Sequence, residues 1–250
     1  MLRTVRATRY VTPLREGSSV PAIVEADDDG LYVVKFRGAG QGPKALVAEL
    51  LAGGIAAVLG LPIPELVLVD MDTHLGRAEP DQEIRELLER SPGLNAGLDF
   101  LPGALPFRPA VSDPPSAALA AEIVWFDALV TNIDRTARNP NLLTWHRRLF
   151  LIDHGAALYV QHTWRDPDEH ARRPFVQAPD HVLLPYAGSL PEADARLAPR
   201  LDAAVLDDIL ADIPDAWLSE PRDDYRRYLL RRLESPRPFV EDAERARLAA

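Results

Sequence analysis

Short apolar runs separated by turn-forming residues fill the first half of the chain, which is the pattern of a β-rich region. Asp27-Asp28-Asp29-Gly30 lies between two runs rich in β-branched residues and predicts a tight hairpin turn. The segments that we expect to be extended are 7–12, 20–26, 31–36, 66–70 and 94–100. The first half is therefore predicted to be mainly β-structure.

Two segments in this half have helical spacing instead. Residues 43–59 repeat apolar side chains near the helical period, with Pro43 suited to a first turn and Gly60 suited to a stop. Residues 79–90 predict a short charged helix that ends at Ser91-Pro92-Gly93. Both helices would pack beside the predicted strands.

Helical patterns dominate the second half. Residues 116–130 predict an apolar helix, and beyond residue 160 the clearest helical segments are 205–213 and 225–233. Two short strands are expected at 142–145 and 148–152. A β-rich half followed by a helical half predicts an α+β protein with two lobes, residues 1–103 and residues 104–250.

Composition narrows the class of protein. The 250 residues are 47% hydrophobic and 26% charged, as expected of a soluble globular chain. No apolar run of membrane-spanning length and no signal-peptide core is present, and the sequence has no cysteine, so we expect no membrane span and a cytoplasmic location. A net charge of −10 argues against a general nucleic-acid-binding surface.

Lysine is rare, since only Lys35 and Lys44 accompany the arginines among 28 basic residues. Lys35 ends a predicted strand, and Glu49 lies on the helix that follows it. A strand lysine and a helix carboxylate can form an ion pair that directs the ammonium toward ATP phosphates. The alternative is a surface lysine and a solvated glutamate.

A loop of small residues precedes this lysine. Gly17, Ser18 and Ser19 lie between the first two predicted strands, where backbone N–H groups could cover phosphates. Neither a G-x-G-x-x-G nor a G-x-x-x-x-G-K-[ST] motif is present, which disfavours a Rossmann site and a P-loop NTPase. There is also no H-E-x-x-H pair for zinc and no G-x-S-x-G elbow of a serine hydrolase.

Two aspartates carry the main functional hypothesis. Asp134 is followed by Asn139 and Asn141, then by an apolar strand and Asp153. Asp134 could take the proton of an acceptor hydroxyl, while Asp153 and one asparagine could hold Mg²⁺ on ATP phosphates. The structural alternative is that both aspartates belong to ordinary turns. Whether Asn139 or Asn141 would bind the metal stays open at this point.

The segment Phe126–Arg135 with Asn139, together with Ile152-Asp153-His154-Gly155, resembles the HipA-like kinases, in the phosphatidylinositol 3/4-kinase-like branch of the protein-kinase-like fold. Leu98–Gly103 is similar to the segment that joins the lobes and cradles adenine in that family. The resemblance covers roughly residues 10–160. Thr136 departs from it, because a histidine often stands at this position.

The resemblance implies a two-lobed protein-kinase-like fold with ATP and Mg²⁺ as cofactors. It implies nucleotide contacts from Asp99, Phe100 and Leu101. Lys35 would contact phosphate, Asp134 would be the catalytic aspartate, and Asp153 with one asparagine would hold magnesium.

We therefore expect a kinase that phosphorylates a Ser or Thr of a protein. The alternatives are a nucleotide-binding pseudokinase that acts as an interaction module, and a small-molecule or lipid kinase. The chain is shorter than the toxin-type members, so a toxin role is not carried over.

Overall fold

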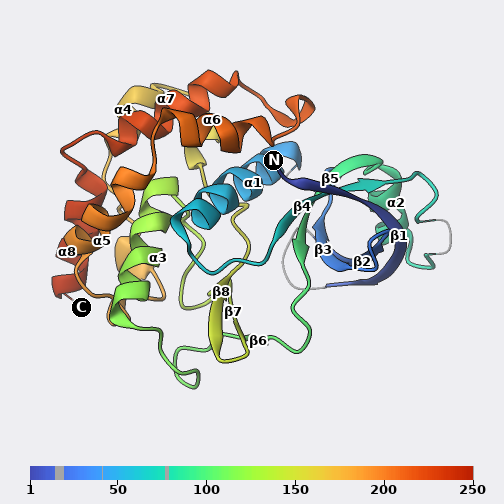
Figure 1. Cartoon of the computed structure of the whole chain (residues 1–250), viewed down its shortest axis with the longest axis horizontal. Helices are drawn as coiled ribbons and strands as arrows, with labels where there is room; N and C mark the ends of the chain where they lie inside the picture. Colours follow the sequence, from blue (N-terminus) through green and yellow to red (C-terminus); the bar gives the residue numbers. More distant parts are fainter. Residues whose placement is uncertain (15–19, 41, 77–78, 250) are drawn as a thin grey trace.

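The computed structural model describes residues 1–14, 20–40, 42–76 and 79–249. Figure 1 shows a β-barrel at one end, a group of helices at the other, and one long helix between them. The predicted phosphate-loop residues Gly17, Ser18 and Ser19 lie outside the described residues.

The barrel is a closed five-stranded sheet in the order β1-β2-β3-β5-β4. Its strands are β1 (Arg3–Pro13), β2 (Ala22–Ala26), β3 (Leu31–Lys35), β4 (Leu66–Met71) and β5 (Gly93–Asp99). Parallel pairing of the first part of β1 with β4 closes the ring. Small and β-branched side chains such as Val5, Ala7, Val24 and Val34 fill the interior, because alternate residues of each strand point inward.

The first helix, α1 (Gly42–Leu59), connects the barrel to the rest of the chain. Gly42 has φ +63°, a conformation that glycine adopts without strain. By length and hydropathy α1 is the one described helix that could cross a membrane, but 61% of that stretch is buried inside the protein, as in the core helix of a soluble protein. Its apolar side chains pack against β5 and α6.

Helix α2 (Gln82–Glu89) covers one end of the barrel. The Asp81 side chain accepts a hydrogen bond from the Glu83 N–H and caps its first turn. Ile84, Leu87 and Leu88 face inward and complete the barrel core.

The C-terminal part is built around α3 (Ala117–Val130), an apolar helix that begins at the N-cap Ser116. A three-stranded antiparallel sheet consists of β6 (Leu105–Pro106), β7 (Leu142–Trp145) and β8 (Arg148–Leu151). The remaining helices are α4 (Pro167–Ala171), α5 (Leu190–Leu197), α6 (Ala203–Ala211), α7 (Arg222–Leu233) and α8 (Pro238–Ala249). Short 3₁₀ turns lie at Tyr159–His162, Ala178–Asp180, Leu184–Tyr186, Ala198–Arg200 and Asp215–Trp217.

The predicted strands and helices are present, with shifted ends. β1 extends from Arg3, whereas the sequence pattern placed it at 7–12, because residues Arg3–Arg6 pair with a strand more than sixty positions away. The helix expected at 79–90 is shorter and starts at Gln82 after its aspartate cap. These differences follow from long-range pairing and capping, which local hydropathy does not encode.

Candidate active site

The ammonium of Lys35 lies between two carboxylates. Its Nζ donates to Glu49 Oε2 and to Asp153 Oδ1, each at 2.6 Å. Lys35 comes from the end of β3, Glu49 from the middle of α1, and Asp153 from the turn that follows β8. The expected ion pair of Lys35 and Glu49 is therefore present, and the Asp153 carboxylate, more than a hundred positions away in the sequence, joins it.

The turn at Asp153 is fixed from behind. The His154 N–H donates to the same Glu49 Oε2 at 2.7 Å, which connects this turn directly to α1. The Gly155 N–H points to Asp153 Oδ1 at 3.4 Å. Asp153 itself has φ +56°, a conformation that asparagine and aspartate tolerate better than most residues.

Burial and charge oppose each other in this triad. Burial alone would lower the pKa of Lys35, but the charges of Glu49 and Asp153 outweigh it, and the pKa is raised. Burial would likewise raise the pKa of Asp153, yet the Lys35 ammonium holds it below its ordinary value. For Glu49, burial prevails over the attraction of Lys35, and its pKa is raised. Lys35 is therefore a cation at neutral pH, and Asp153 is an anion.

Asp134 lines the same cavity as Lys35 and Asp153. Its Oδ2 accepts from Asn139 Nδ2 at 2.7 Å and faces Asn141 Nδ2 at 3.4 Å. The Ile152 N–H donates to the Asn141 carbonyl at 3.0 Å, which places Asn141 next to the residue that precedes Asp153. Both asparagines thus lie close to Asp134, and Asn141 also lies close to the Asp153 turn.

A buried polar network supports the Asp134 loop from below. Asp127, in the last turn of α3, is fully buried and accepts from Arg135 Nε at 2.6 Å and from Asn132 Nδ2 at 2.9 Å. Arg135 also donates to the carbonyls of Asn141 and Ile152. One guanidinium therefore holds the segments on either side of the β7–β8 hairpin, next to Asp134 and Asp153.

The Asp127 carboxylate also contacts a histidine from a later part of the chain. His181 Nε2 lies 2.9 Å from Asp127 Oδ2, while His181 Nδ1 accepts from the Leu183 N–H at 3.1 Å. The second bond assigns the proton of the neutral ring to Nε2, so the ring donates to Asp127. Burial would raise the pKa of Asp127, but the Arg135 charge and the His181 bond hold it well below its ordinary value.

This network was not predicted in full from the sequence. Arg135 pairs with a carboxylate of the preceding helix, and His181 lies fifty-four positions beyond Asp127. A buried aspartate in the apolar pattern of 116–130 was the available signal, because a carboxylate on such a helix requires a partner.

A cavity of about 700 Å³ joins these groups. It is lined by the predicted site residues Lys35, Asp99, Phe100, Leu101, Asp134, Asn139, Asn141 and Asp153. Glu49 lies behind Lys35 and does not line the cavity. Leu14 and Pro21, which flank the segment 15–19, also line it, and the Leu14 N–H donates to the Pro21 carbonyl at 2.7 Å.

The cavity walls differ in chemistry. Val33, Leu98, Leu143 and Ile152 give the cavity an apolar lining. Asp99, at the end of that strand, has a pKa raised by partial burial and by the charge of Glu65. An apolar slot beside a lysine suits a ligand with an apolar part and an anionic part, while the nearby carboxylates suit a cation bound to that anionic part.

The donors available for a metal are oxygens. Within residues 1–14, 20–40, 42–76 and 79–249, no three His, Asp or Glu side chains cluster as a metal site. The Asp153 carboxylate is 43% exposed, however, and Asn139 and Asn141, whose side chains carry amide oxygens, line the same cavity. Such a set fits Mg²⁺, which binds through one or two protein oxygens and completes its shell with phosphates and water.

Comparison with known protein families identifies the family of this chain. The model of the HipA-like kinase family matches residues 8–234. The chain belongs to the HipA-like kinases. Among curated proteins, none matches it.

Solved structures share the fold of this HipA-like kinase. The Helicobacter pylori proinflammatory kinase CtkA is 13% identical with a TM-score of 0.63, over 100% of this chain and 99% of that one. The Golgi casein kinase with Mn/ADP bound is 13% identical with a TM-score of 0.53, over 97% of this chain and 73% of that one. At this identity the similarity concerns the fold alone, so any conclusion about the reaction has to rest on the geometry of the site.

Proposed function

We propose that this HipA-like kinase transfers the γ-phosphoryl group of ATP, with Mg²⁺, to a Ser or Thr hydroxyl of a protein. The observation that carries the proposal is the position of the Lys35 ammonium between Glu49 and Asp153, in a cavity that Asp134 also lines. We further propose two lobes, residues 1–103 and 104–250, with the cleft between them.

ATP would lie with its base in the apolar slot and its phosphates at Lys35. Asp99, Phe100 and Leu101 line the same cavity. A raised pKa keeps Lys35 cationic, so it can balance phosphate charge while Glu49 holds it in position.

Mg²⁺ would be held by Asp153 and Asn141. Asn141 is favoured over Asn139 because its carbonyl accepts from the Ile152 N–H, which places its backbone beside the residue that precedes Asp153. Asn139, with the shorter bond of 2.7 Å to Asp134 Oδ2, would orient that carboxylate. The metal would neutralise charge on the phosphates and align them for transfer.

Asp134 would accept the proton of the attacking hydroxyl. Its carboxylate keeps one well-made bond, from Asn139, and has further acceptor capacity that faces the cavity. Removal of a positioned general base typically lowers rates by about 10²–10⁴-fold. This range sets the size of the effect to be measured.

The test is phosphate incorporation from Mg²⁺-ATP, measured by mass spectrometry on the purified protein and on a Ser/Thr peptide library. Wild type should incorporate phosphate, and Asp134→Ala should lose it by about 10²-fold or more. Asp208→Ala, an exposed α6 aspartate, is the matched control and should act as wild type.

Thermal unfolding with Mg²⁺-ADP separates the alternative functions. Nucleotide-dependent stabilisation without any phosphate transfer would identify a pseudokinase. Transfer to a small alcohol or lipid but to no peptide would identify the other kinase class. Loss of stabilisation in Asp153→Ala is expected for the proposed metal site.

A further inference from the structure

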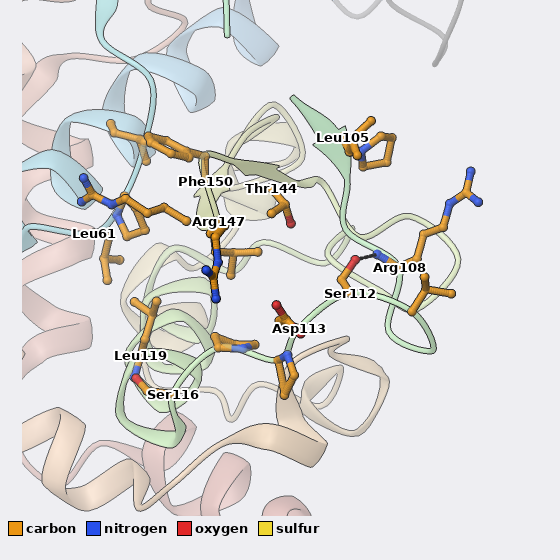
Figure 2. Close-up of a pocket in the computed structure, with 18 of the residues that line it drawn as sticks. Leu61, Leu105, Arg108, Ser112, Asp113, Ser116, Leu119, Thr144, Arg147 and Phe150 are labelled. Carbon is orange, nitrogen blue, oxygen red and sulfur yellow. Dashed lines mark hydrogen bonds between the residues drawn. The ribbon is translucent and has the colours of Figure 1, made fainter. Parts of the chain in front are cut away.

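A second cavity, of about 1130 Å³, lies outside the kinase cleft. It is bounded by the loop before β4, by β6 and the segment after it, by the start of α3, and by the β7–β8 hairpin (Figure 2). Among the described residues, Pro106 alone lines both cavities. The second cavity is thus a groove largely separate from the first.

The groove is basic on an acidic protein. Arg108, Arg147 and Arg148 line it against one carboxylate, Asp113, although the chain carries a net charge of −10. Within the part of the chain that the structure describes, no ion pair neutralises any of the three guanidinium groups. Figure 2 shows Arg147 extending from the hairpin into the space above the start of α3.

Apolar side chains lie between these charges. Leu105 is 68% exposed and Val111 is 80% exposed, which is unusual for large hydrophobic residues. Leu61, Leu119 and Phe150 line the groove more deeply. The groove therefore offers apolar contacts and positive charge to the same occupant.

The groove also borders the outer edge of β8, where the loop before β4 already pairs with Leu151 and leaves the backbone of Leu149 facing the groove. The Leu151 N–H of β8 donates at 2.8 Å to the Pro62 carbonyl, so the backbone of Leu151 faces away from β7. Residues two apart in a strand present their backbone groups to the same side, so Leu149 faces this edge too, and Leu149 lines the groove. β8 is the outer strand of its sheet.

We propose that this groove binds an extended acidic segment of a partner protein, which adds as a strand beside β8. Its acidic side chains would meet Arg147 and Arg148, and its apolar side chains would contact Leu105 and the groove floor. Strand addition gives affinity through the backbone and selectivity through alternate side chains. The inference does not depend on phosphoryl transfer.

The test uses a fluorescein-labelled peptide of about nine alternating glutamate and valine residues, long enough to span a typical strand. Fluorescence anisotropy on the full chain should show saturable binding. Arg147→Glu/Arg148→Glu should weaken binding by about tenfold or more, since two charge contacts become repulsive. The matched control Arg6→Glu/Arg165→Glu changes the charge equally at exposed arginines away from the groove and should bind as wild type.

Two further probes test the apolar contacts and the backbone pairing separately. Leu105→Ser removes an exposed contact without disturbing the core and should weaken binding several-fold. A peptide N-methylated at alternate residues should lose binding, because it cannot pair with the β8 edge. Equal binding of a glutamine-for-glutamate peptide, equal loss in the control double variant, or no saturation would overturn the proposal. So would tighter binding of a single-stranded oligonucleotide, or self-association that the Arg147/Arg148 variant abolishes.

Discussion

At the scale of single residues, Asp127 does the most to position the candidate active site without lining its cavity. Its carboxylate holds Arg135, which in turn holds the backbone at Asn141 and Ile152. Arg135 is 1% exposed and Asp127 is fully buried. Loss of either partner would leave an uncompensated charge in the core.

We predict that Asp127→Asn destabilises the protein by about 3–5 kcal/mol, the cost of breaking a buried pair. Urea unfolding followed by tryptophan fluorescence measures this change. Asp207→Asn breaks the exposed pair with Arg226 and should cost under about 1 kcal/mol. Equal losses of unfolding free energy in the two variants would show that the buried pair contributes no more to stability than the exposed pair.

The same pair predicts a pH dependence. The folded-state pKa of Asp127 is depressed, so its contribution to stability is present above the ordinary Asp pKa of about 4 and is lost as the pH falls below it. The difference in unfolding free energy between wild type and Asp127→Asn should therefore shrink by about 1 kcal/mol from pH 7 to pH 3. A difference that stays constant or grows would contradict the depressed pKa.

Alanine substitutions of Asn139 and Asn141 should change different kinetic parameters. Asn141→Ala is expected to raise the Mg²⁺ concentration needed for half-maximal phosphoryl transfer by about tenfold or more, a typical cost of losing a metal ligand or its support. Asn139→Ala is expected to lower the turnover at saturating Mg²⁺ with little change in that concentration. A Mg²⁺ titration of each variant checks the assignment, and the reverse pattern would make Asn139 the ligand.

Much of this site was predictable from residue types alone. Asp134, Asp153 and Lys35 line one cavity, as the order of motifs suggested. The β7–β8 hairpin explains how, because pairing of Leu142 with Leu151 returns the chain to its starting point. His181 was not predictable, since its partner Asp127 is remote in sequence and no spacing rule connects them.

At the scale of elements, α1 carries the contact between the barrel and the helical part. Its two central glycines allow close approach: a Cβ on Gly53 would lie 2.7 Å from Leu66 Cδ1, and one on Gly54 would lie 2.5 Å from Ile209 Cγ2. Arg200 donates to the carbonyls of Val58 and Leu59, the last turn of this helix. The helix is thereby held by β4 on one side and by α6 and Arg200 on the other.

We predict that Gly54→Ala destabilises the protein although alanine favours helices. Overpacking costs about 1–3 kcal/mol, which exceeds a propensity gain of about 1 kcal/mol, because the β-branched Ile209 has little freedom to move. Urea unfolding measures the change. Gly40→Ala is the control, since nothing lies within 4 Å of its added Cβ.

The double variant Gly54→Ala/Ile209→Ala tests the cause. Removal of the opposing side chain should make the double variant more stable than the sum of the two single effects predicts. Strict additivity would show that the clash is relieved elsewhere. Hydropathy predicted that residues 43–59 form a helix, but Gly53 and Gly54 reveal their role only in the packed structure.

At the scale of the whole molecule, one apolar core runs from α1 through α3 to α8. The barrel has its own smaller core, and α1 packs on the outer face of β4 and β5. All four tryptophans lie in residues 104–250, at 125, 145, 164 and 217. Tryptophan fluorescence therefore reports on the helical part alone, whereas far-UV circular dichroism reports on the whole chain.

We predict that the two signals change together in urea, in a single cooperative transition. The reason is that unfolding the helical part would expose the face of α1 that packs on α6. Because α1 also packs on β4 and β5, the barrel would lose stability at the same time. A fragment of residues 1–103 should accordingly lack a cooperative transition. Two separated transitions in the full chain would instead show that the two parts are independent folding units.

Closure of the barrel also affects how the protein behaves when it is concentrated. A sheet with an open side offers unpaired backbone groups to other molecules and can nucleate aggregation, whereas a ring of strands has no such side. Parallel pairing of β1 with β4 completes that ring, and both strands are rich in valine and other β-forming residues. A substitution that disrupts the pairing of β1 with β4, such as Val67→Pro, should therefore first lower the solubility of the protein.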